Sequence, residues 1–109
     1  MSKDEELGLR IRNVLGQASG IIEKKMFGGV GFLLRGNMFC GINKGRLIVR
    51  VGPGQDKVAL AQPYARPFDM TGKPMAGWVM VEAPGFETVE ALQEWLKQAL
   101  AFNETLPAK

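Results

Sequence analysis

Four short β-rich runs follow one another through the first half of the chain, and turn-forming residues separate them. The connections Arg35-Gly36-Asn37 and Asn43-Lys44-Gly45 have the length and residue types of hairpin turns. Consecutive runs are therefore expected to pair antiparallel, as a meander. The four runs are Ile21 to Phe27, Val30 to Leu34, Met38 to Asn43 and Arg46 to Val51.

Three helical segments are predicted around these runs. Residues 4–18 place apolar side chains on one helical face, and residues 55–61 are expected to form a short helix. Ser19-Gly20 is expected to end the first helix, and Thr88 to cap the last one. The apolar stripe predicted for the last helix is Val89, Leu92, Leu96, Ala99 and Leu100, with Trp95 beside it.

Two further strands are expected between the second and third helices, joined by a tight turn around Thr71-Gly72 and ending at Val81. The predicted order is then α-β-β-β-β-α-β-β-α. Such an order favours an α+β fold, in which an antiparallel sheet of about six strands carries helices mainly on one face. The length of 109 residues predicts a single domain over residues 1–109.

The composition argues against most catalytic and metal-binding chemistry. The chain has no histidine and one cysteine, so the usual general base, the commonest metal ligand and any paired-thiol motif are missing. We therefore expect a protein that is not an enzyme and holds no cofactor or metal. The one thiol, Cys40, lies in an apolar run and is expected to be buried.

Location is predicted from two features of the chain. Its apolar runs are far shorter than the roughly 20 residues that span a bilayer. Its first residues are acidic and polar, whereas a signal peptide begins with a basic and then an apolar segment. A cytoplasmic location and no membrane partner are expected.

A glycine-rich segment, Met26 to Phe32, invites comparison with phosphate-binding loops. Those loops need a following helix or a Lys-Ser/Thr pair, whereas a strand follows here. Glycines inside a strand more often mark a bulge or a close backbone contact, which is the interpretation we favour.

Basic residues concentrate in the middle of the chain. Residues 24–73 hold nine Lys or Arg against two Asp, and residues 82–104 hold five Glu against one Lys. Basic surfaces attract phosphate backbones, so a nucleic-acid-binding sheet surface is one hypothesis and ordinary solubilising charge is the other. The candidate nucleic-acid-binding residues are Lys24, Lys25, Arg46, Arg50 and Lys73.

A candidate protein-interaction surface follows from strand alternation. If Leu47 and Val49 face the helices, Ile48 faces the other side, where it is joined by Trp78 and Met80 or by their neighbours Val79 and Val81. An exposed apolar cluster there would serve association with a partner or a second copy. The alternative is that residues 66–75 fold over this face. The interaction candidates are Ile48, Trp78 and Met80.

Several segments together resemble the TfoX N-terminal domain family, whose members include the Sxy/TfoX regulators of bacterial natural competence. The segments are Lys25 to Phe32, Gly36 to Phe39, Gly45 to Leu47, Arg66 to Phe68 and Gly72 to Val79.

The resemblance implies the α+β fold, a bacterial cytoplasmic setting and no catalytic residues. The family's competence regulators carry a second, C-terminal domain, and this chain ends at Lys109 without one. The resemblance leads us to expect one of two functions. The first is a regulatory or protein-interaction module linked to transcription, with a protein partner or self-association. The alternative is a weak nucleic-acid binder that uses a basic sheet surface. No small-molecule substrate is expected.

Overall fold

The computed structural model describes residues 3–16, 20–26, 29–69 and 74–108. These residues form the predicted order of helices and strands, with one additional short 3₁₀ helix, η1. None of the helices over these ranges is long and apolar enough to cross a membrane. The elements are α1 (Lys3–Leu15), β1 (Ile21–Met26), β2 (Gly29–Leu34), β3 (Asn37–Asn43), β4 (Arg46–Arg50), α2 (Asp56–Leu60), β5 (Ala65–Asp69), β6 (Pro74–Val81), η1 (Ala83–Phe86) and α3 (Val89–Asn103).

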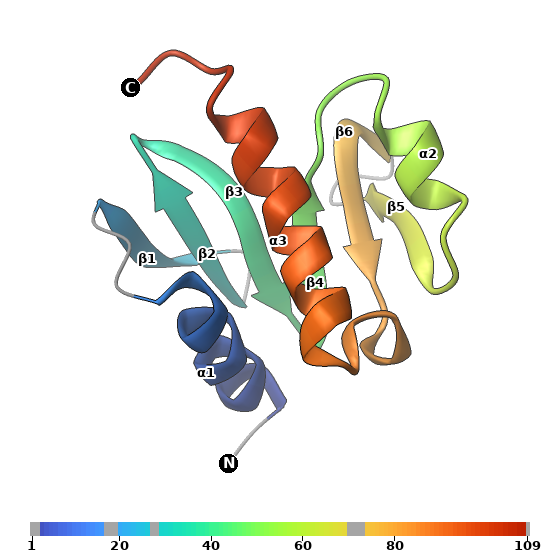
Figure 1. Cartoon of the computed structure of the whole chain (residues 1–109), viewed down its shortest axis with the longest axis horizontal. Coiled ribbons are helices and arrows are strands. Elements are labelled where there is room, and N and C mark those ends of the chain that lie inside the picture. Colours follow the sequence, from blue (N-terminus) through green and yellow to red (C-terminus); the bar gives the residue numbers. More distant parts are fainter. Residues whose placement is uncertain (1–2, 17–19, 27–28, 70–73, 109) are drawn as a thin grey trace.

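The six strands form one antiparallel sheet in the order β1-β2-β3-β4-β6-β5. The first four strands are the predicted meander, and β6 pairs with β4, so that β5 lies at the edge. In Figure 1, α1 and α3 lie in front of the sheet and α2 lies at its β5–β6 end. The α+β fold with antiparallel strands is confirmed.

The two tight turns of the meander owe their shape to positive backbone φ angles. Arg35 and Gly36 have φ of 56° and 82°, and Lys44 and Gly45 have φ of 51° and 76°. Two successive positive φ values are typical of type I′ hairpin turns, whose twist matches that of the flanking strands. The local sequence therefore fixes the pairing of β2 with β3 and of β3 with β4.

One hydrophobic core lies between the helices and the sheet. Leu7 and Ile11 of α1, Ala59 of α2 and Leu92 of α3 belong to the same buried cluster as the strand residues. All three helices therefore contact the same face of the sheet. The strand residues in this cluster are Phe32, Phe39, Cys40, Ile42, Leu47, Val49, Val79 and Val81.

The start of α3 is as predicted, whereas the set of residues that it buries differs from the predicted apolar stripe. The Oγ1 atom of Thr88 accepts a hydrogen bond from the backbone N–H of Ala91 at 3.0 Å, which confirms the cap. Val89, however, is 55% exposed, and Trp95 is buried in the core. The buried stripe is rotated toward Trp95 because η1 supplies a hydrogen-bond acceptor for its indole, the Gly85 carbonyl.

Some predicted boundaries are corrected by backbone geometry. The first helix ends at Leu15 because Gly16 adopts φ of 64°, a left-handed conformation that ends helices. Ala83-Pro84-Gly85, predicted only to end a strand, lies in η1. Ser19, Phe27 and the Thr71-Gly72 turn lie outside the described residues.

The glycine-rich segment makes the close contact that we expected of it. A side chain on Gly29 would place its Cβ 1.8 Å from the carbonyl oxygen of Ile42 on the neighbouring strand β3. Only glycine allows the two backbones to approach this closely. The role of Gly29 is therefore to let β2 and β3 pair.

Candidate functional site

The sheet face opposite the helices carries the predicted interaction residues. Ile48 of β4 pairs with Met80 of β6, and Arg50 pairs with Trp78. Because Val79 and Val81 belong to the helix-side core, alternation places Trp78 and Met80 on the other side with Ile48. We call this side the outer face and define it by the side chains of Lys24, Arg46, Ile48, Arg50, Arg66, Phe68, Trp78 and Met80.

The strand registers align one row of residues straight across the outer face. The row has a cation at each end, two glycines on the β1 side of its centre and two apolar residues on the β5 side. From β1 to β5, the row consists of Lys24, Gly31, Gly41, Ile48, Met80 and Arg66.

Of the exposed and the covered alternatives for Ile48, the structure favours the covered one, because this side chain is only 2% exposed. Ile48 lies between Met80 on one side and Gly41 on the other. The missing side chain of Gly41 leaves space that Met38 enters, since its Cε would lie 2.6 Å from a Cβ on Gly41. Ile48 is thus the buried base of the outer face.

The accessible part of the outer face is formed by Trp78 and Met80, both half-buried. Phe68 of β5 supports Trp78, with 5.9 Å between the two ring centroids and 50° between their planes. Phe68 itself is 4% exposed and lies outside the helix-side core cluster. The outer face therefore has a small apolar layer of its own beneath its surface.

Two of the predicted nucleic-acid-binding residues have partners within the chain. The Nε atom of Arg46 lies 3.0 Å from the Oε1 atom of Glu82, and the Nε atom of Arg66 lies 3.5 Å from the same oxygen. The guanidinium of Arg50 lies over the rings of Trp78 and Phe102, at 5.5 Å and 5.3 Å from their centroids. Arg46 and Arg50 are therefore held by contacts within the chain, and neither side chain extends freely from the sheet.

The two predicted lysines of β1 lie on opposite faces of the sheet. Lys24 pairs with Gly31 in the outer-face row, whereas Lys25 pairs with Val30, which packs against the helix-side core. Both side chains are exposed. Lys73 lies outside the described residues. The five basic candidates therefore do not form one continuous patch over the described part of the chain.

Two residues of the outer face were missed among the sequence candidates. Glu82 joins Arg46 to Arg66, and Phe68 supports Trp78. Alternation along β5 and β6 would have placed Phe68 on the face of Arg66, and Glu82 on the face of Met80. The sequence does not show which strands become neighbours in the sheet. The contact partners of Phe68 and Glu82 could therefore not be predicted from it.

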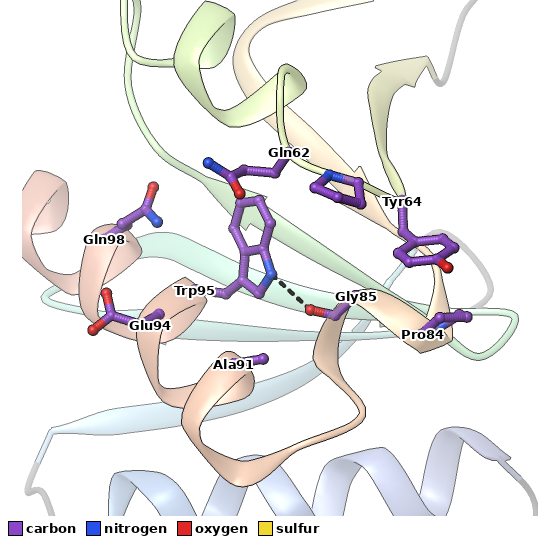
Figure 2. Close-up of a pocket in the computed structure, with 9 residues that line it drawn as sticks. Gln62, Tyr64, Pro84, Gly85, Ala91, Glu94, Trp95 and Gln98 are labelled. Atoms are coloured by element: carbon purple, nitrogen blue, oxygen red, sulfur yellow. Dashed lines mark hydrogen bonds between the residues drawn. The ribbon is translucent and has the colours of Figure 1, made fainter.

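A hollow lies on the helix side of the molecule, between η1, α3 and the loop before β5. Figure 2 shows the indole of Trp95 inside it, with Gln62 above the ring, Tyr64 and Pro84 across from it, and Glu94 and Gln98 on α3. We call this hollow the Trp95 pocket. Its volume is about 430 Å³, and its lining residues are Gln62, Pro63, Tyr64, Pro84, Gly85, Ala91, Glu94, Trp95 and Gln98.

An apolar groove of about 760 Å³ lies between α1 and α3. Ile21 and Leu34, from the first two strands, contribute to its lining, together with Val14 of α1 and Leu100 of α3. Lys97 and Glu104 also line it, so its edges bear both signs of charge.

Neither hollow has the composition of a metal centre over its described residues. Over the described ranges, no three Asp, Glu or Cys side chains lie together in a group that could hold a metal ion. Cys40 is fully buried, and burial raises the pKa of its thiol far above the ordinary value.

Comparisons with known proteins relate this fold to others. A family model described as the TfoX N-terminal domain matches residues 13–103. Among solved structures, the chain is similar to the crystal structure of Deinococcus radiodurans protein DR2400, which has a domain described as DUF419. The TM-score is 0.63 at 20% sequence identity, over 89% of this chain and 79% of that chain, a likeness that shows the fold alone. No curated protein matches the sequence.

Proposed function

Because this chain belongs to the TfoX N-terminal domain family, we propose that it is a non-enzymatic regulatory module that binds a protein partner. The binding surface in this proposal is the outer face. The setting is the bacterial cytoplasm, and the regulated process is transcription, in the way the family's competence regulators suggest.

One observation carries the proposal, namely the composition of the accessible outer face. Trp78 and Met80 are half-buried and stand on a buried base of Ile48 and Phe68. Trp, Met and Arg are the residue types enriched in protein interfaces, where an apolar centre is surrounded by a polar rim. Arg46, Arg50 and Arg66 supply that rim here.

The charge of the outer face indicates the chemistry of the partner. This face carries the cations of Lys24, Arg46 and Arg66 and one described carboxylate, Glu82, while the guanidinium of Arg50 also lies over Phe102 of α3. The excess is positive, so the partner in our proposal presents an acidic surface with an apolar centre. Such complementarity increases the association rate and selects among partners.

Weak binding of nucleic acid is the alternative, and the contacts of the arginines favour a protein partner over it. Arg46 is neutralised by Glu82, and Arg50 is stacked on two aromatic rings. Releasing either side chain to a phosphate would cost these contacts. Arg66 contacts the same carboxylate as Arg46, and Lys24 lies at the opposite end of the outer-face row from Arg66.

The experiment compares Met80→Glu, which places a negative charge on the outer face, with Val58→Glu on α2. Val58 is 63% exposed and lies on the other side of the sheet, so it is a matched control. The proposal expects wild type and Val58→Glu to retain a partner from a bacterial lysate that Met80→Glu loses. That partner, once purified, should bind wild type in calorimetry at one per chain, and its acidic surface should make binding weaken as salt rises.

Two results would contradict the proposal. The first is a purified partner that binds Met80→Glu as tightly as wild type, provided thermal melting shows both variants folded. The second is duplex DNA that binds wild type in gel-shift assays with a steep salt dependence and loses binding in Arg66→Glu, since that result favours the nucleic-acid alternative.

A further inference from the structure

Trp95 forms the floor of the Trp95 pocket and is held in place by a hydrogen bond. The indole Nε1 of Trp95 donates a hydrogen bond to the Gly85 carbonyl at 3.1 Å, as Figure 2 shows. Its one polar group is therefore engaged within the chain. Trp95 is 6% exposed, so the apolar surface open to a ligand comes mainly from Tyr64, which is 53% exposed, and from the exposed Pro63 and Pro84.

Tyr64 forms a wall of the pocket in a conformation that its own packing does not explain. Its φ is 68°, which is uncommon for a bulky side chain and costs conformational energy. The backbone is held there because the Glu82 N–H donates to the Tyr64 carbonyl at 2.9 Å. Yet the residue is 53% exposed, so little burial compensates for the strain. Strained backbone positions of this kind cluster at active sites and ligand-binding sites.

The described lining of the pocket includes one carboxylate and no cation. Glu94 lines it, and Glu90 lies one helical turn earlier on α3, where like charges four residues apart repel each other. No described cation forms an ion pair with either carboxylate. A positively charged ligand would relieve this repulsion, so the lining selects for one.

We propose that the Trp95 pocket binds an extended peptide segment of a partner protein in which proline lies next to lysine or arginine. Proline rings pack well on aromatic and proline-lined walls, and a polyproline II segment loses little entropy on binding. The amides of Gln62 and Gln98 can both donate to and accept from a peptide backbone. The basic side chain pairs with Glu94. A volume of about 430 Å³ is within the usual range of ligand sites.

This site is independent of the outer face. Trp95 belongs to the helix-side core, whereas Trp78 lies on the opposite side of the sheet. The chain has two tryptophans, so each face carries one indole reporter. Failure of one proposal leaves the other unaffected.

The test is a ¹⁵N NMR titration of the whole chain with the capped hexapeptide APPKPA. We expect saturable movement of the Trp95 indole N–H peak and no movement of the Trp78 peak. Peptide APPEPA, with the charge reversed, should bind about fivefold more weakly or worse, as expected for a partly exposed ion pair. Peptide AAAKAA, without prolines, should also bind more weakly because its flexible chain must be ordered.

Two variants distinguish binding from structure. Tyr64→Gly removes the ring and accepts the positive φ without strain, so its melting temperature should stay near that of wild type while affinity for APPKPA falls about tenfold. Glu94→Lys should reverse the preference toward APPEPA. Glu104→Lys, at the other end of α3 and outside the Trp95 pocket, is the matched control and should bind like wild type.

Three outcomes would overturn the proposal. The first is that millimolar APPKPA causes no saturable movement of the Trp95 indole peak. APPEPA or AAAKAA could bind as tightly as APPKPA. Alternatively, Tyr64→Gly could keep wild-type affinity, which would mean that the strained ring takes no part in binding.

Discussion

Ile48 and Met80 are direct partners across strands β4 and β6, and they differ in exposure: Ile48 is 2% exposed, whereas Met80 is half-buried. The pair therefore spans the boundary between the base of the outer face and its surface. Acidic substitutions at the two positions should therefore differ in how much they destabilise the fold.

Ile48→Asp is expected to destabilise the fold by about 3 kcal/mol or more, because an unpaired charge would be buried. Met80→Glu should cost about 1 kcal/mol or less, since its carboxylate can reach water. Urea unfolding of the two variants measures both values. Equal losses would mean that Met80 is as buried in solution as Ile48.

Asp56 links the start of α2 to β6, because its Oδ2 accepts a hydrogen bond from the Gly77 N–H at 3.0 Å. Hydrogen bonds to its carboxylate, that from Gly77 foremost, hold the pKa of Asp56 below its ordinary value. A depressed pKa contributes stability above the unfolded-state pKa of about 3.9, and this contribution is lost as pH falls through the folded-state pKa.

Asp56→Asn should therefore melt below wild type at neutral pH, and the gap should close on acidification below about pH 4. Thermal melts across this range test the prediction. A gap that stays constant into strong acid would show that the charge of Asp56 contributes nothing.

Gly77 has φ of 84° and no room for a side chain. A Cβ there would lie 3.0 Å from the carbonyl carbon of Gly52 and from the nitrogen of Pro53. Gly77→Ala should therefore cost more than the roughly 1–2 kcal/mol expected from the positive φ alone. Gly54, with φ of 90° and open space around it, is the matched control.

Urea unfolding should thus rank wild type as most stable, Gly54→Ala next and Gly77→Ala least stable. If the two alanine variants were equally stable, the contact with Gly52 and Pro53 would be relieved by a small backbone shift.

Cys40 is 0% exposed, and burial raises the pKa of its thiol. Since the thiolate is the reactive form, the native protein should not react with a thiol reagent such as DTNB, and one thiol per chain should react in denaturant. Fast labelling without denaturant would contradict the burial.

Much of the fold was predictable because its causes are local. Lys44-Gly45 turns the chain with two positive φ values, one of which its glycine favours, and Thr88 caps α3 through a bond to a residue three positions later. Where a prediction failed, the deciding contact was distant. Trp95 is buried because η1, absent from the predicted order, accepts its indole hydrogen bond.

The candidate site was predicted only in part. Alternation paired Trp78 with Met80 and Val79 with Val81, and it left open which of the two pairs shares the face of Ile48. The sequence also left open whether Arg46 and Arg50 bind nucleic acid or only solubilise the chain, and it did not show that Glu82 and two aromatic rings engage them. These contacts join residues up to 52 positions apart, as in Arg50 with Phe102, and periodicity does not encode them.

The sequence by itself determined the order of helices and strands, the antiparallel meander and the lack of a histidine-based chemistry, because turn geometry, alternation and residue content are properties of short segments or of composition. The tertiary structure alone decided that Ile48 is buried, that Glu82 joins Arg46 to Arg66, and that the rings of Tyr64 and Trp95 line one pocket. The physical reason is that burial and charge pairing depend on which strands become neighbours, and the order β4-β6-β5 arises only when the whole sheet packs against its helices.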